Sequence, residues 1–93
     1  MTSRLDKWLW CARFYRSRAL AQEACESGLL RLNSRRVEKS GASVKPGDVL
    51  TLPRAREVLA VRILATAERR GPAKEATLLY EIVTPLDPAP PSP

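Results

Sequence analysis

The chain has no histidine, and this absence removes the side chain that most often moves protons at neutral pH. A general acid or base would have to be a carboxylate, lysine, tyrosine or cysteine with a shifted pKa, and no motif places a second catalytic group beside one. The four glycines stand apart at positions 28, 41, 47 and 71, so there is no glycine-rich phosphate loop. We therefore expect a protein that is not an enzyme and needs no cofactor.

Cysteine is also scarce, since the chain has only Cys11 and Cys25. Two cysteines without a histidine are too few for a tetrahedral zinc site, so we expect no structural metal. Arg4 and Lys7 share a helical face with Cys11 and would lower the pKa of its thiol. Without a partnered base, however, a packed thiol is the favoured interpretation.

No apolar run approaches the roughly 20 residues that a membrane-spanning helix needs, and the first residues lack the apolar core of a signal peptide. We expect no membrane partner, a cytoplasmic location and a monomer. Ninety-three residues suit one small domain, which we place at residues 4–84. Residues 85–93 contain five prolines and predict a disordered tail.

Positive charge is unevenly placed along the chain, whose net charge is +6. Residues 1–45 hold ten Lys/Arg against four Asp/Glu, whereas residues 46–93 hold six against six. A basic surplus confined to one part of a small domain favours a polyanionic partner, and nucleic acid is the commonest. The stretch 7–22 also contains both tryptophans, the phenylalanine and one tyrosine, so it is aromatic and basic at once.

Two amphipathic helices are predicted in the basic half. Helical periodicity from Arg4 predicts about three turns, with Asp6 and Arg13 on the far side from an inward face formed by Leu5, Trp8, Leu9 and Ala12. Ser17 can cap a second helix over residues 18–27, which Gly28 ends. The inward stripe of this second helix is Leu20, Ala21, Ala24 and Cys25.

After Gly28 the pattern changes to short β-like runs. They predict an antiparallel sheet with a hairpin turning at Asn33-Ser34, a Pro-Gly turn at 45–48, and strands over 48–52 and 57–66. Residues 69–83 fit a helix or a strand, and Pro72 and Glu75 favour a short helix. The predicted fold class is α+β, with two packed N-terminal helices against a small antiparallel sheet and a short C-terminal helix.

The mixture of aromatic and basic residues has a simple interpretation. Trp8 anchors the first helix, the neighbouring aromatic rings support the turn between the helices, and arginines on this platform bind phosphate or stack on unpaired bases. Two alternatives remain open. The charges are a solvated surface, or the basic face docks an acidic protein partner with the proline-rich tail as a second ligand.

Residues 4–50, from RLDKWLW to KPGDVL, resemble the αL RNA-binding motif of bacterial ribosomal small-subunit protein S-four, pseudouridine synthases and tyrosyl-tRNA synthetases. Within that superfamily, RLDKWLW, ARFYRSR and RRGPAKEATLLYE are most similar to the ribosome-associated heat-shock RNA-binding proteins of fifteen kilodaltons. The resemblance implies an RNA surface made by the helix pair and the following hairpin. The implied RNA-binding residues are Arg4, Lys7, Arg13, Arg16, Ser17, Arg18 and Gln22 from the helix region, with Arg31, Asn33, Arg36 and Lys39 from the hairpin region.

The resemblance also implies a partner. It points to structured ribosomal RNA, and to tRNA, on large ribosomal subunits that carry a stalled nascent chain under heat stress. A general RNA chaperone or regulator is the alternative, and single-stranded DNA stays open as a ligand. Such hairpins usually turn on Asn-Gly, so Asn33-Ser34 predicts a differently shaped loop and a less secure contact at Asn33.

Overall fold

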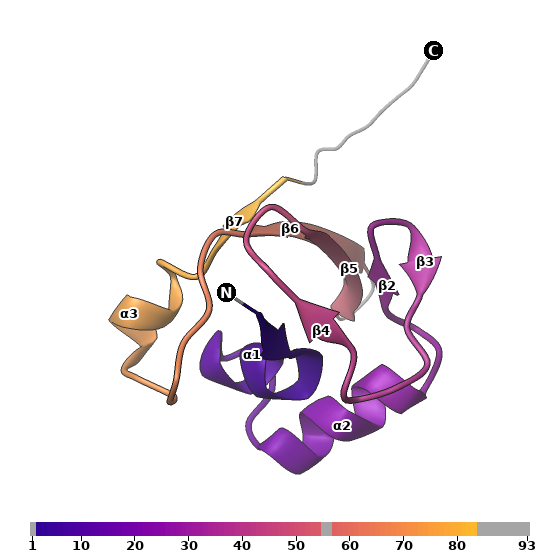
Figure 1. The fold of residues 1–93 in the computed structure, drawn as a ribbon, viewed down its shortest axis with the longest axis horizontal. Helices are drawn as coiled ribbons and strands as arrows, with labels where there is room; N and C mark the ends of the chain where they lie inside the picture. The colour runs from indigo at the N-terminus through magenta and orange to yellow at the C-terminus, as the bar shows by residue number, and fades with distance from the viewer. Residues whose placement is uncertain (1, 55–56, 84–93) are drawn as a thin grey trace.

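The computed structural model describes residues 2–54 and 57–83, which form short helices and short strands. The elements in chain order are β1 (Ser3–Arg4), α1 (Leu5–Cys11), α2 (Arg18–Glu26), β2 (Arg31–Leu32), β3 (Arg35–Arg36), β4 (Ser43–Val44), β5 (Val49–Arg54), β6 (Glu57–Ile63), α3 (Ala73–Ala76) and β7 (Tyr80–Ile82) (Figure 1). The predicted α+β class is confirmed. The predicted tail over 85–93 lies outside the described residues.

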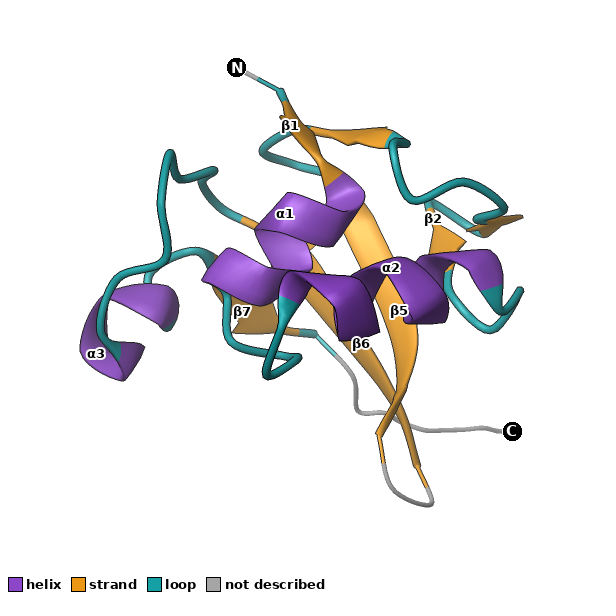
Figure 2. Ribbon diagram, turned by 90° about the horizontal axis from the view of Figure 1, so that it is seen from below, coloured by secondary structure: helices purple, strands orange, loops and turns teal. Residues whose placement is uncertain are grey.

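The larger sheet has five strands in the order β3-β2-β5-β6-β7, and each neighbouring pair is antiparallel. β1 and β4 form a separate antiparallel pair where α1 begins, which the sequence did not reveal. Helices α1 and α2 lie across one face of the larger sheet (Figure 2). The core therefore fills the space between the helix pair and the sheet.

The inward face predicted for the first helix is correct. Leu5, Trp8 and Leu9 have no exposed surface, and α2 adds Ala21 and Cys25 to the same core. The sheet and the segments around it contribute Leu30, Val37, Val44, Leu50, Leu52, Val61 and Ile63. Because these side chains meet in one contiguous cluster, the orientation of the helix pair is fixed by apolar burial.

The first helix is shorter than the three turns predicted. It spans seven residues, and it ends because Arg13 adopts a φ of 66°, which a helix cannot continue through. The Arg13 guanidinium donates two hydrogen bonds to the carbonyl of Gly71, at 3.1 and 3.0 Å. This contact ties the turn after α1 to the loop before α3.

Two side chains differ in burial from the prediction. Asp6 was expected on the far side from the core but is completely buried, because α2 crosses α1 there and covers it. Leu20 was expected in the core but is 44% exposed, because Ala21 and Cys25 are the residues of α2 that face the sheet. The hydrophobic periodicity of one helix does not predict where a second helix packs against it.

The second helix begins and ends as predicted. The Ser17 side chain accepts a hydrogen bond from the backbone N–H of Leu20 at 3.1 Å, which satisfies one of the free donors of the first turn. Gly28 follows the helix with a φ of 83°, a conformation that glycine adopts without steric cost. The Ser17 cap fixes the start of α2 and so places Arg18, its first residue, next to α1.

The hairpin between β2 and β3 corrects another expectation. Asn33 and Ser34 have φ values of 51° and 75°, so both turn residues are left-handed, as in the usual two-residue hairpin turn, and the predicted change of loop shape is wrong. The Asn33 side chain donates to Asp48 at 3.0 Å and accepts from the backbone N–H of Val49 at 2.9 Å. These bonds hold the turn to the start of β5 and stabilise the left-handed pair.

Residues 69–83, whose sequence fits a helix or a strand, form one of each. A short helix, α3, begins after Pro72, as favoured. The residues that follow it form β7, which pairs with β6 at the edge of the larger sheet. Tyr80 on β7 brings an aromatic ring to within 4.7 Å of the Phe14 ring, measured between centroids, so the turn between the helices packs on this edge.

Candidate nucleic-acid interface

A buried carboxylate gathers the basic side chains of the helix pair. Asp6 accepts hydrogen bonds from the Arg4 guanidinium at 3.2 and 3.3 Å and from the Gln22 side-chain amide at 3.2 Å. The Arg18 guanidinium lies 3.6 Å from the same carboxylate. We call Asp6, Arg4, Arg18 and Gln22 the Asp6 cluster. Three residues expected to bind RNA are thus held together by one that was not.

The charge state of the Asp6 cluster follows from its contacts. Burial raises the pKa of Asp6, but hydrogen bonds from Gln22, from Arg4 and from the backbone N–H of Lys7, together with the charge of Arg18, outweigh burial and leave the pKa below its ordinary value. The carboxylate is therefore ionised at neutral pH. A fixed negative charge beneath two arginines orients both guanidinium groups.

A polar hollow of about 380 Å³ lies beside the Asp6 cluster. Three cationic side chains, those of Arg4, Lys7 and Arg18, contribute to its wall. The remaining lining residues are Thr2, Ser3, Thr66, Ala67 and Glu68. About half of the Arg4 and Arg18 side-chain surface stays exposed, so both guanidinium groups retain donors for a ligand while Asp6 holds them. Three cations with hydroxyl donors around one hollow suit a phosphate group.

The hairpin supplies a second group of cations. Arg31, Arg36 and Lys39 are exposed, as expected of binding residues, and Arg35 at the hairpin turn is exposed with them although the sequence did not single it out. The Arg36 side chain lies against Gly28 at the end of α2. The hairpin cations are therefore adjacent to the helix pair.

Several other residues predicted to bind have structural contacts. Arg13 is committed to Gly71, Ser17 caps α2, and Asn33 holds the hairpin turn. Arg16 is exposed in the turn between the helices. Of the helix residues predicted, the structure brings together Arg4, Lys7, Arg18 and Gln22, and it places Arg13 and Arg16 outside the polar hollow.

Neither cysteine has the properties of a nucleophile. Burial raises the pKa of the Cys11 thiol, and this outweighs the charges of Lys7, Arg18 and Arg70 that lower it. Burial, followed by the charges of Asp6 and Glu26, raises the pKa of Cys25 to about 12. Both thiols are protonated at neutral pH, as the packed-thiol interpretation requires.

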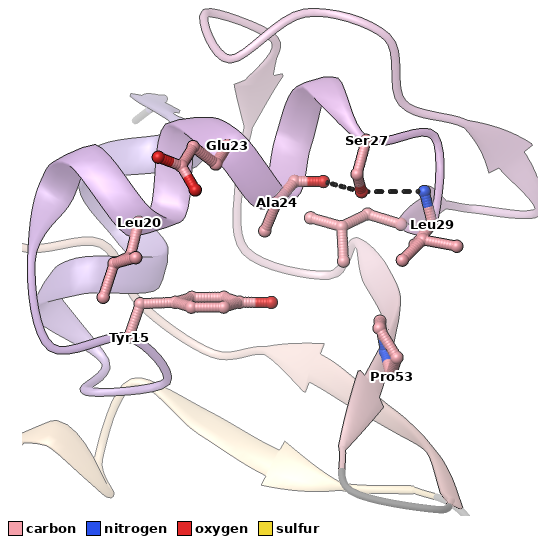
Figure 3. Close-up of a pocket in the computed structure, with 8 residues that line it drawn as sticks. Tyr15, Leu20, Glu23, Ala24, Ser27, Leu29 and Pro53 are labelled. Atoms are coloured by element: carbon pink, nitrogen blue, oxygen red, sulfur yellow. Dashed lines mark hydrogen bonds between the residues drawn. The ribbon is translucent and has the colours of Figure 1, made fainter.

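An apolar groove between α2 and β5 contrasts with the polar hollow. The Tyr15 ring and Leu20 line it on one side, Leu29 and, on β5, Pro53 lie on the other, and the charged side chain in its lining is the acidic Glu23 (Figure 3). A negative rim repels phosphate. The groove therefore does not belong to the candidate interface.

Comparison with known protein families finds a match over the segment that contains the Asp6 cluster. The S4 domain model matches residues 3–50, which is more than half of the chain. The chain belongs to the S4 domain family. The S4 segment contains the Asp6 cluster, the hairpin and the β1–β4 pair. The resemblance stated from the sequence is confirmed.

Individual relatives extend beyond the S4 segment. The chain is 47% identical over 78 residues to heat shock protein 15 of Escherichia coli K12, a match that covers 84% of this chain and 58% of that protein. It is 38% identical over 79 residues to the RQC P-site tRNA stabilizing factor of Halalkalibacterium halodurans, covering 85% and 88%. The trimeric structure of Vibrio cholerae heat shock protein 15 matches with a TM-score of 0.83 and 37% identity, covering 89% and 83%. The monomer expected here stays a prediction.

Some residues that line the polar hollow or contact α1 lie outside the S4 segment, and sequence reasoning missed them. Thr66 and Glu68 line the polar hollow, and Arg70 donates to the carbonyl of Trp10 at 2.9 Å and lies over its ring at 5.7 Å. No local pattern places residues 66–70 beside the first helix. Asp6, in contrast, could have been singled out from the sequence. It is the single acidic residue among the first 22 residues, which also contain five cations.

Proposed function

We propose that this protein binds RNA through the Asp6 cluster and acts on large ribosomal subunits that carry a nascent chain linked to tRNA, within the cytoplasm and without a catalytic step. The observation that carries the proposal is the polar hollow, where Asp6 holds two arginines beside Lys7. Membership of the S4 family supports RNA as the polyanion. The printed name of one relative, a P-site tRNA stabilizing factor, supports the subunit with tRNA as the target.

Within the described residues, no helix is long and apolar enough to cross a membrane, and no three cysteine or carboxylate side chains gather where they could hold a metal ion. The chain spans 58% of the length of the Escherichia coli relative, so the proposal concerns what these 93 residues do. Electrostatic contacts to phosphate would supply most of the affinity and would fix the orientation of the protein on the RNA.

Co-sedimentation with purified ribosomal subunits tests the proposed target. We expect the protein to pellet with large subunits that carry peptidyl-tRNA at a lower concentration than with empty large subunits, and to be released as salt is raised, because phosphate contacts release counterions. Equal binding to both particles would support a general RNA chaperone instead. Binding to neither particle, with binding to an acidic protein, would favour the interaction-module alternative.

Asp6→Asn separates positioning from net charge. Removing a negative charge makes the protein more basic, so electrostatic attraction alone predicts tighter RNA binding. We expect weaker binding, by about tenfold or 1.4 kcal/mol, because an uncharged amide no longer orients Arg4 and Arg18. Titration of labelled RNA measures the affinity. Tighter binding by Asp6→Asn would show that the cluster is not a positioned site.

The same variant gives a stability readout with a defined pH dependence. We expect a loss of about 1–2 kcal/mol at neutral pH, kept small because both arginines are half exposed to solvent. The pKa of Asp6 is lowered by folding, so its contribution is fully present above the ordinary carboxyl value of 3.8 and is lost as the pH falls through the lower folded value. Urea unfolding at neutral pH and below pH 4 should show the two proteins converging in acid.

A further inference from the structure

A second hollow, of about 450 Å³, lies beside the β2–β3 hairpin. We call it the hairpin hollow. Most of its wall is apolar, and its rim carries more positive than negative charge. The lining residues are Leu32, Arg35, Arg36, Val37, Glu38, Lys39, Gly41 and Ala42. Its size falls within the range of about 300–1,000 Å³ that is typical of small-ligand sites.

The composition of the hairpin hollow differs from that of the polar hollow and suits a different part of the same ligand. Leu32, Val37 and Ala42 offer apolar contact, which a phosphate group does not use. An unpaired nucleobase has two apolar faces and is flanked by phosphates. Arginine serves both parts, since its planar guanidinium stacks on a base and bonds a phosphate oxygen.

Arg4 connects the two hollows. Its guanidinium lines the polar hollow, and it also lies against Gly41 of the hairpin hollow, where a Cβ added to that glycine would be 3.6 Å from Cζ and from Nη2 of Arg4. This distance is an ordinary van der Waals contact, so the Arg4 side chain packs at the edge of the hairpin hollow. An RNA strand whose phosphates bind at the Asp6 cluster therefore has the Arg4 cation at the edge of the hairpin hollow.

The charged residues that line the hairpin hollow are mostly cations. Glu38 is the acidic lining residue, against Arg35, Arg36 and Lys39. Arg35 lies opposite Leu32 in the antiparallel register, so the two side chains are on the same face of the hairpin. The pairing places a guanidinium directly beside the apolar wall.

We propose that the hairpin hollow takes one unpaired base of the bound RNA, with the planar guanidinium groups of Arg35 and Arg36 stacking on the base. The inference rests on the proposed RNA-binding function, and it adds that the protein selects RNA with an unpaired nucleotide next to the phosphates held by the Asp6 cluster. An acidic protein segment would use the same cations but would not need the planar face of arginine.

Two RNA probes with equal numbers of phosphates test the proposal: a stem with unpaired loop nucleotides and a blunt duplex. We expect the wild-type protein to bind the looped RNA about tenfold more tightly, and an abasic site at one loop position to remove that preference, since stacking of a single base contributes roughly 5- to 150-fold in affinity, a range that includes this factor. The charge-preserving double variant Arg35→Lys, Arg36→Lys should also lose the preference, because lysine keeps the positive charge but has no planar group to stack on a base. The matched control, Arg62→Lys with Arg69→Lys, lies outside both hollows and should keep the preference.

Each other outcome has one meaning. Equal binding of the wild-type protein to both probes would overturn the unpaired-base inference and leave the proposed RNA-binding function standing. A preference that survives in the lysine double variant would place the base elsewhere. Binding of neither probe would overturn the proposed function and the inference with it, and displacement of RNA by polyglutamate at equal charge concentration would assign the hairpin hollow to an acidic partner. Circular dichroism of each variant establishes that it is folded.

Discussion

Trp8→Ala is expected to lower the free energy of unfolding by about 3–5 kcal/mol, a large part of the stability of a small domain. Trp8 has no exposed surface, and its indole N–H donates to the carbonyl of Ala65 at 2.9 Å. Its ring lies 6.0 Å from that of Phe14 and 6.5 Å from that of Tyr80, measured between centroids. The substitution therefore removes the contacts that join α1, the helix turn and β7, and leaves the partly buried carbonyl of Ala65 without its donor.

The matched control is the second tryptophan of the same helix. Trp10 is only partly buried and contacts Arg70 through its ring, so Trp10→Ala should cost clearly less than Trp8→Ala. Urea unfolding followed by circular dichroism measures both. If Trp8→Ala unfolds at the same urea concentration as the wild-type protein, the core described here is wrong.

Local sequence patterns predicted those parts of the fold that depend on local rules. The inward face of α1, the Ser17 cap, the Gly28 end of α2 and the two-residue hairpin each follow from periodicity or from the conformational preference of one residue. The burial of Asp6 does not follow from such rules, because it results from α2 crossing α1. The β1–β4 pair was missed for a similar reason, since two-residue strands carry no periodicity.

The candidate site, like the fold, was predicted only in part from the sequence. The cations were found from composition and from the family resemblance, but which of them act together was not, because Arg13 turns toward Gly71 while Arg4 and Arg18 turn toward Asp6. A contact with one buried carboxylate thus decides which arginines share a hollow. Residues 66–68 reach the polar hollow through tertiary packing alone, so no reading of the first 45 residues reveals them.

If RNA phosphates bind at the polar hollow, removing its cations should change the salt dependence of RNA binding. The triple variant Arg4→Ala, Lys7→Ala, Arg18→Ala removes the three cations of the hollow. Its matched control, Arg62→Ala, Arg69→Ala, Lys74→Ala, removes the same charge from exposed positions outside it. The slope of log affinity against log salt concentration should be shallower in the hollow variant by about 2–3 units, since each phosphate contact contributes about 0.7–0.9, and should be nearly unchanged in the control. Equal slopes in the two variants, both folded by circular dichroism, would contradict the account.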